Sequence, residues 1–242
     1  MKIMDYEEMN YQSFPQGRQW EVSMAFPVLM RKTYMWMSMA LVLTGLSAFV
    51  VATNATISNF LFTYHQLIWV LFLAEIGLVI GLSAAINKIS LATATLMFVA
   101  YAILNGVTLS SLFYVYTTGS LASTFLICAA TFGAMSLVGY TTKSDLSSIG
   151  KYLIMALIGL IIATIVNIFV KSSGLEMIMT YVGVLIFVGL TAYDTQKIKR
   201  MFMNAPDAGE STQKYAVLGA LTLYLDFINL FLYLLRLFGR RN

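Results

Sequence analysis

The sequence predicts an all-α integral membrane protein with seven transmembrane helices, and three observations lead to this prediction. Of the 242 residues, 59% are hydrophobic and 11% are charged, whereas a soluble domain carries roughly 25% charged residues. The mean hydropathy is +0.79. The chain also contains seven apolar stretches of about 20 residues, the length that a helix needs to cross a bilayer. The net charge of +4 sits at the ends of these stretches, so no nucleic-acid partner is expected.

The seven segments are broken mainly by Gly, Ser and Thr, which suit close helix contacts in a membrane. In chain order, we expect helices at approximately 33–52, 67–86, 91–116, 121–140, 151–170, 177–197 and 216–238. The first follows Arg31 and Lys32, and the fourth ends before Lys143. The second contains Glu75, the sixth Asp194 and the seventh Asp226.

The expected organisation is an N-terminal tail at residues 1–32 and one seven-helix transmembrane domain at 33–242. The first 30 residues lack an apolar core, so no cleavable signal peptide is expected. The longest polar connection is expected at 200–215.

Lys and Arg in the connections predict the orientation, because cytoplasmic loops are enriched in both. Alternate connections place 11 basic residues on the N-terminal side and 4 on the other, which predicts a cytoplasmic N-terminus. Seven crossings then put the basic tail "RLFGRRN" outside, against the same rule. We expect seven spans, and a last segment that re-enters without crossing is the alternative.

Three of the 11 acidic residues lie inside apolar segments, namely Glu75, Asp194 and Asp226. A charge at the bilayer centre costs about 2.5–3.5 kcal/mol on insertion scales, so such residues usually mark an ion or proton path. Carboxylate oxygens are also the ligands that Ca²⁺ prefers. These residues are therefore the candidate ion and proton sites.

The positions of Asp194 and Asp226 allow the two side chains to meet. At 1.5 Å rise per residue, Asp194 lies about 5–8 Å inside its membrane boundary and Asp226 about 15 Å along the next, antiparallel helix. Two carboxyl groups in contact share a proton and titrate as a unit. In the alternative, structural interpretation Asp194 pairs with Lys197 and Asp226 hydrogen-bonds Asn229 or a neighbouring helix.

Long stretches of the chain resemble the Bax inhibitor-1 family, also called the transmembrane Bax-inhibitor-motif family, and the short N-terminal tail is similar to its bacterial branch. The resemblance covers roughly residues 30–241 and is carried by "AEIGLVIGLS" (74–83), "YAILNGVTLSSLFYVYTTGS" (101–120), "TFGAMSLVGYTTKSDLSSIGKYL" (131–153), "YVGVLIFVGLTAYDTQKIKRM" (181–201) and "GALTLYLDFINLFLYLLRLFGRR" (219–241).

This resemblance implies a fold in which the last helix is central and is wrapped by the other six. It also implies a pH-sensitive calcium leak, with Asp194 and Asp226 as the hydrogen-bonded pH sensor and Glu75 on the ion path. All three would contact Ca²⁺ transiently. No arginine lies in or just after the second segment to lock the aspartates, and Lys88 is the nearest candidate cation.

The implied setting is the bacterial inner membrane, where the protein would be a monomer. Its partners would be the bilayer, Ca²⁺, protons and possible membrane proteins, and no cofactor is expected besides the permeant ion.

Enzymes of three classes fit the sequence poorly, and we expect no catalytic activity. An intramembrane aspartyl protease needs Gly-x-Gly-Asp, where this chain has Leu-Tyr-Leu before Asp226. A zinc hydrolase needs several histidines, and the single histidine, His65, is expected in an external loop. A retinal protein needs a lysine inside the last helix. A non-conducting interaction protein that modulates a membrane protease or a stress or death pathway remains the alternative, which an ion-flux assay distinguishes.

Overall fold

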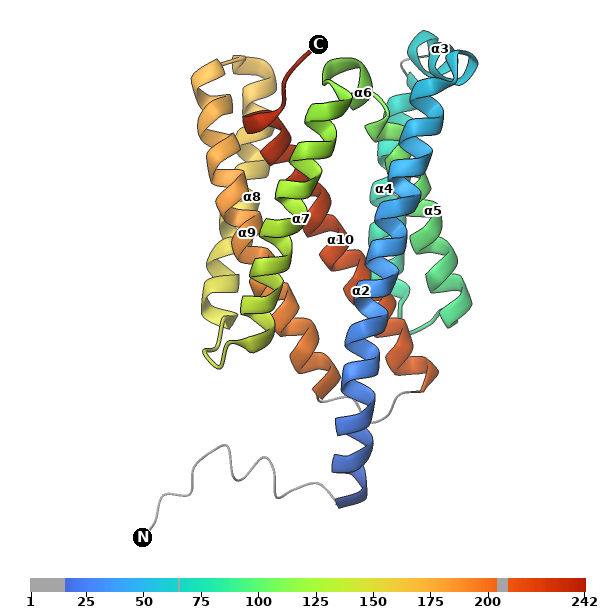
Figure 1. Cartoon of the computed structure of the whole chain (residues 1–242), viewed down its shortest axis with the longest axis vertical. Coiled ribbons are helices and arrows are strands. Elements are labelled where there is room, and N and C mark those ends of the chain that lie inside the picture. The colour runs from blue at the N-terminus through green and yellow to red at the C-terminus, as the bar shows by residue number, and fades with distance from the viewer. Residues whose placement is uncertain (1–15, 65, 204–208) are drawn as a thin grey trace.

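The computed structural model describes residues 16–64, 66–203 and 209–242, and these form helices from end to end (Figure 1). His65 and the Pro206–Ala208 part of the polar connection lie outside the described residues. The helices are α2 (Gln16–Thr53), α3 (Ala55–Thr63), α4 (Gln66–Ala85), α5 (Leu91–Leu109), α6 (Leu112–Val115), α7 (Thr118–Thr141), α8 (Ser147–Val170), α9 (Ser173–Met203) and α10 (Glu210–Phe238).

The prediction of seven transmembrane segments is confirmed, because the described residues hold seven helical stretches long and apolar enough to cross a membrane. Their outward faces are apolar, as a bilayer requires; Phe169, for example, is 80% exposed. The short helix α3 was not predicted. Asn54 starts it, since its side-chain oxygen accepts hydrogen bonds from the backbone N–H groups of Thr56 and Ile57 at 3.1 and 3.2 Å.

Two segments are longer than predicted. Helix α2 begins at Gln16, so the expected tail of residues 1–32 contains the first turns of a helix that continues into the membrane. Helix α9 runs to Met203 and α10 begins at Glu210, which shortens the expected connection at 200–215. Polar residues can extend a helix beyond the bilayer, and hydropathy therefore places such ends poorly.

Helix α10 crosses the whole bundle, which rules out the re-entrant alternative. Near its start, Lys214 Nζ donates to the Ile89 carbonyl oxygen at 2.9 Å, on the connection before α5. Beyond its end, the backbone N–H of Thr117 donates to the Arg240 carbonyl oxygen at 3.1 Å, on the connection before α7. These two connections lie at opposite ends of the bundle (Figure 1).

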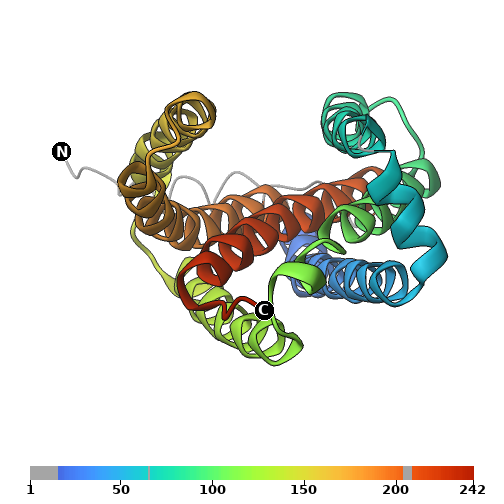
Figure 2. The same cartoon turned by 90° about the horizontal axis from the view of Figure 1, so that it is seen from above.

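Helix α10 passes between α9 on one side and α2 and α5 on the other (Figure 2). It has the largest buried share of the seven spans, and Val217, Leu223, Tyr224 and Leu230 have no exposed surface. It also packs against α7 and, over a short stretch, α4, whereas α8 packs against α9. A last helix wrapped by all six others stays a prediction.

Close helix contacts depend on small residues, as expected for packing in a membrane. A Cβ on Gly139 of α7 would overlap the backbone of Ala192 in α9, and a Cβ on Gly106 of α5 would overlap Ser47 and the Thr44 carbonyl oxygen of α2. Glycine at these positions therefore lets α7 approach α9 and α5 approach α2. The first contact lies two residues from Asp194.

Candidate functional site

The structure brings Asp194 of α9 and Asp226 of α10 together in the interior. Asp194 is 8% exposed and Asp226 is 5% exposed, and the two carboxyl groups lie close enough to interact directly. An ionised carboxylate has no donor, so two neighbouring carboxyl groups can hydrogen-bond only when one of them carries a proton. The geometry therefore allows the pair to share a proton.

Few other groups around the pair offset the energetic cost of burying the two carboxyl groups. Asp226 Oδ2 is buried, and no N–H or O–H donor among the described residues reaches it. Lys197 is exposed, and its Nζ lies 5.9 Å from the centroid of the Tyr193 ring. It acts on both carboxyl groups electrostatically without forming an ion pair among the described residues. Asn229 Nδ2 donates to the Leu225 carbonyl oxygen of its own helix at 2.8 Å.

Glu75 lies at a second place, between α4 and α5. Glu75 and Leu82 are the buried residues of α4, and Glu75 is 7% exposed. Its Oε1 accepts a hydrogen bond from Thr108 Oγ1 at 2.6 Å, and its Oε2 accepts one from Asn105 Nδ2 at 3.2 Å. Both donors lie on α5. The carboxyl group is thus turned away from lipid and stabilised by neutral donors, with no cation paired to it among the described residues.

The hydrogen bonds from Glu75 continue to α10. The Tyr224 hydroxyl of α10 donates to Asn105 Oδ1 at 3.1 Å. It also lies 2.6 Å from Thr44 Oγ1 of α2. Glu75, Asn105, Tyr224 and Thr44 therefore form a buried polar network that connects α4, α5, α10 and α2.

The two places lie on different sides of α10. Tyr224 and Asp226 are two residues apart, and at 3.6 residues per turn such side chains point in nearly opposite directions. Tyr224 reaches toward α5 and α2, and Asp226 reaches toward α9. Among the described residues no three His, Cys, Asp or Glu side chains converge on one metal position. Glu75 and the aspartate pair are therefore separate sites.

Lys88, the expected cationic partner, is exposed on the connection between α4 and α5. The cation with an electrostatic effect on both aspartates is Lys197 instead. Lys88 makes no side-chain hydrogen bond or ion pair within the part of the chain that is described, so its assigned role stays a prediction.

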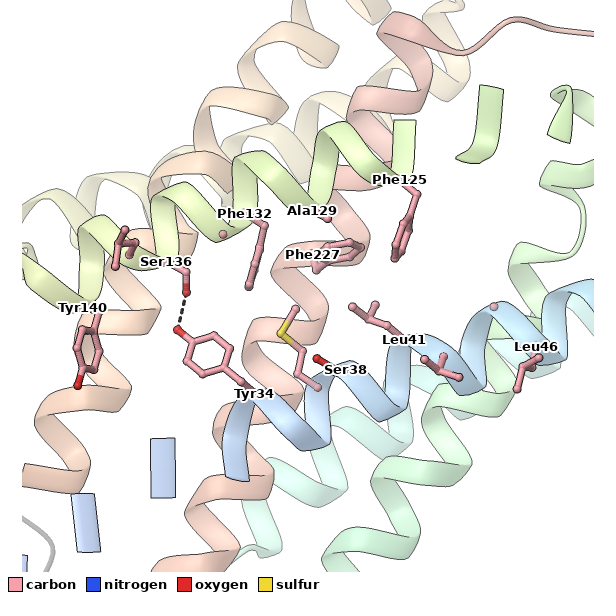
Figure 3. Close-up of a pocket in the computed structure, with 15 residues that line it drawn as sticks. Tyr34, Ser38, Leu41, Leu46, Phe125, Ala129, Phe132, Ser136, Tyr140 and Phe227 are labelled. Atoms are coloured by element: carbon pink, nitrogen blue, oxygen red, sulfur yellow. Dashed lines mark hydrogen bonds between the residues drawn. The ribbon is translucent and has the colours of Figure 1, made fainter. Parts of the chain in front are cut away.

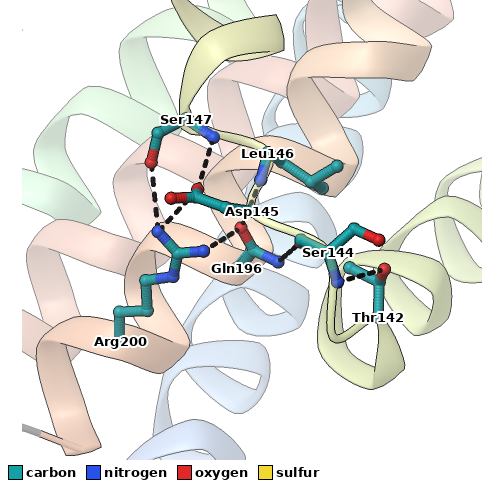
Figure 4. Close-up of polar contacts among 7 residues, drawn as sticks. All are labelled: Thr142, Ser144, Asp145, Leu146, Ser147, Gln196 and Arg200. Carbon is teal, nitrogen blue, oxygen red and sulfur yellow. Dashed lines mark hydrogen bonds and ion pairs between the residues drawn. The ribbon is translucent and has the colours of Figure 1, made fainter. Parts of the chain in front are cut away.

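A cluster of polar residues, among which Gln196 is buried, fixes the end of α9 beyond the aspartate pair (Figure 4). Arg200 Nη1 lies 2.8 Å from Asp145 Oδ1 and donates to Ser147 Oγ at 3.0 Å. Gln196 donates to the Ser144 carbonyl oxygen and accepts from the Leu146 backbone N–H, at 2.8 and 2.9 Å. The connection between α7 and α8 is thereby attached to the helix that carries Asp194.

The pKa of Asp145 is lowered to about 2, first by the backbone N–H and hydroxyl of Ser147 and then by Arg200. A lowered pKa means that the ionised form, and its contribution to stability, is present above the usual carboxyl pKa of 3.8 and is lost as the pH falls toward 2. Asp145 therefore keeps its charge at neutral and mildly acidic pH.

The partners of Glu75, namely Asn105, Thr108, Thr44 and Tyr224, were not predicted from the sequence. One signal was present, because Asn105 is a strongly polar side chain inside an apolar run, and such residues hydrogen-bond across helices. The hydroxyl-bearing residues carried no signal, since Thr and Tyr are common throughout these segments.

The fold and the site define a multi-pass membrane protein whose interior contains a pair of neighbouring buried aspartates and a separate buried glutamate. A family model described as "Inhibitor of apoptosis-promoting Bax1" matches residues 27–242. The chain therefore belongs to the Bax inhibitor family, which confirms the resemblance found in the sequence.

Bacterial relatives are similar over almost the whole chain. The "Inner membrane protein YbhL" of Escherichia coli strain K12 is 52% identical over 214 residues, 88% of this chain and 92% of the relative. An uncharacterized protein of Borreliella burgdorferi is 48% identical, over 87% of this chain and 91% of the relative. The "Uncharacterized protein RP147" of Rickettsia prowazekii is 45% identical, over 88% and 89%.

Proposed function

We propose that this protein is a pH-sensitive calcium leak channel of a bacterial inner membrane, gated by the aspartate pair. The observation that carries the proposal is the contact between the buried carboxyl groups of Asp194 and Asp226. A shared proton would let this contact join α9 to α10. Loss of that proton leaves two charges that repel each other in a region of low dielectric.

The position of the pair suits a gate at one end of the bundle. With the N-terminus cytoplasmic, as the basic residues predict, the pair lies toward the cytoplasmic side of α9 and α10. The name of the Escherichia coli relative supports an inner-membrane location.

A line of polar groups supports access for a cation from the side of the membrane opposite to the aspartate pair. A cavity of 120 Å³ lies among α3, α4 and α5, and Ser58, Thr108 and Ser110 are among its lining residues. Thr108 donates to Glu75, and the network continues through Asn105 to Tyr224 on α10. Glu75 would supply carboxylate oxygens to a hard cation such as Ca²⁺ along this line.

The test is flux of Ca²⁺ into liposomes loaded with a calcium-sensitive dye. Purified protein should admit Ca²⁺ down its gradient faster than protein-free liposomes, without a nucleotide. Leu126→Ala is a matched control on the lipid-facing surface of α7, where the side chain is 68% exposed, and it should conduct like the wild type.

Equal rates with and without folded protein would refute the leak channel. That result would favour the non-conducting interaction protein, which binds a membrane partner and passes no ions.

A further inference from the structure

A long groove lies between α2 and α7, and α10 forms its floor (Figure 3). Its volume is 820 Å³. Tyr34 and Leu46 mark its two ends on α2, Tyr140 and Phe125 mark them on α7, and Phe227 lies on the floor. The rest of the lining is mainly Leu, Val, Met, Phe, Ala and Gly. The groove is therefore apolar along its length.

The groove opens sideways, to the surface that the bilayer covers. Leu46 and Leu137 line it and are 57% and 62% exposed, and both lie within membrane-spanning stretches. The space above Gly45 and Gly133 is open, since a Cβ at either position would meet nothing within 4 Å. The groove is thus a hollow that faces hydrocarbon.

The length of the groove fits a lipid acyl chain. From Tyr34 to Leu46 the groove is about 18 Å long, and from Phe125 to Tyr140 it is about 22 Å long. One leaflet contributes only about 15 Å of hydrocarbon, so an acyl chain can lie along it.

One basic residue contacts the end of the groove at Tyr34 and Tyr140, and two others are near this end in the sequence. Lys199 Nζ donates to the Tyr140 carbonyl oxygen at 2.8 Å and lies 5.3 Å from the centroid of its ring. This bond uses one of the three N–H donors of an ammonium group. Arg31 and Lys143 are exposed, and each lies three residues from one of these tyrosines. Asp145, the acid nearest to Lys143 in sequence, is paired with Arg200 at 2.8 Å.

We propose that this groove binds one anionic phospholipid, with an acyl chain between α2 and α7 and the headgroup phosphate beside Lys199 and Arg31. Basic residues near a membrane surface attract anionic lipid, and an apolar hollow that faces the bilayer contains acyl chains rather than water. The inference stands apart from the proposed channel, because lipid binding needs neither conduction nor titration of the aspartates.

A bound lipid would contact the surroundings of the aspartate pair. Phe227 on the floor follows Asp226 in the chain. Ser136 on the wall lies 3.0 Å from Thr195 Oγ1, the residue after Asp194, and 2.5 Å from the Tyr34 hydroxyl. The lipid would therefore fill the space beside the helices that carry both carboxyl groups.

Electron spin resonance of spin-labelled phosphatidylglycerol and phosphatidylcholine, in phosphatidylcholine vesicles that contain the full chain, tests the proposal. Wild-type protein should immobilise phosphatidylglycerol in preference to phosphatidylcholine. Lys199→Gln and Arg31→Gln should each lower that preference about fivefold, the effect of one basic residue near the surface. Lys151→Gln, an exposed position at the start of α8, is the matched control and should keep it.

The apolar part is tested by filling the groove. Gly133→Leu should remove most of the immobilised phosphatidylglycerol, whereas Gly159→Leu should not, because Gly159 has the same open space but lies on α8. Equal binding of both lipids by the wild type, or unchanged binding by Gly133→Leu, would overturn the proposal. A dimer in which a second copy of the chain covers the groove and no lipid is held would overturn the proposal as well.

A second measurement uses unaltered protein, in case Gly133→Leu fails to fold. Phosphatidylglycerol with a photoreactive diazirine in its acyl chain should label Phe125, Leu137 and Leu46 more strongly than the face of α8. An excess of unlabelled phosphatidylglycerol should suppress that labelling. Uniform labelling of α7 and α8 would contradict a defined site.

Discussion

Replacing Asp194 with Asn removes the titration of the aspartate pair while it keeps the contact. The Asn amide N–H can donate to the Asp226 carboxylate without any shared proton. In the proposed mechanism the contact between the two carboxyl groups depends on one proton in the wild type, and in Asp194→Asn it does not. The variant should therefore hold the helices together at every pH, and Asp226→Asn should act in the same way.

The size of the effect follows from the burial and contact of the two groups, which are 8% and 5% exposed. Two bare carboxylates about 4 Å apart repel by about 4 kcal/mol at an effective dielectric constant of 20. Because about 1.4 kcal/mol is a factor of ten, losing the shared proton shifts the contact equilibrium by roughly three orders of magnitude. The contact is kept at low pH, where the pair holds a proton, and is lost as the pH rises.

The assay combines Ca²⁺ flux into dye-loaded liposomes with hydrogen exchange of the backbone amides at the end of α9, both followed from acidic to alkaline pH. Wild-type exchange should speed up as the pair loses its proton, beyond the intrinsic pH dependence measured in Asp194→Asn, and flux should change over the same range. Both Asn variants should give flat flux profiles. The double variant should add little to either single one, since the two residues titrate as one unit.

Asp145→Asn is the matched control for this experiment. The pKa of Asp145 is lowered to about 2, so it stays ionised over the tested range and its removal should leave the pH profile unchanged. A full pH response in Asp194→Asn or Asp226→Asn, or additive effects in the double variant, would refute the reasoning.

Three other predictions concern the polar network and the helix packing. Glu75→Gln keeps the side-chain volume and removes the charge, so Ca²⁺ flux should fall while the thermal unfolding temperature holds; unchanged flux would make Glu75 purely structural. Tyr224→Phe leaves the buried Asn105 without its donor and should lower the free energy of unfolding by about 1–3 kcal/mol, measured against Tyr152→Phe, whose residue is 72% exposed. Gly139→Ala places a Cβ against the backbone of Ala192 and should cost about 1–3 kcal/mol in the same measurement, whereas Gly159→Ala, with open space around it, should cost little.

Hydropathy alone determined the number of membrane spans and identified the unusual carboxyl groups. The bilayer imposes the same length and apolar composition on each segment independently of its neighbours, so both features can be read from the chain. The contact between Asp194 and Asp226 could also be predicted from the sequence. They lie on consecutive antiparallel helices, and the rise per residue places both in the same half of the membrane.

The partners of Glu75 and the groove between α2 and α7 were decided only by tertiary structure. Which face a helix turns inward depends on its rotation about its own axis, and packing against several neighbours at once sets that rotation. Glu75 therefore meets Asn105 and Thr108 because α4 packs on α5. The groove exists because α2 and α7 both pack against α10 and leave a hollow between them. The hydropathy of a single segment cannot predict the partners of Glu75 or the groove, because each depends on surfaces that distant parts of the chain supply.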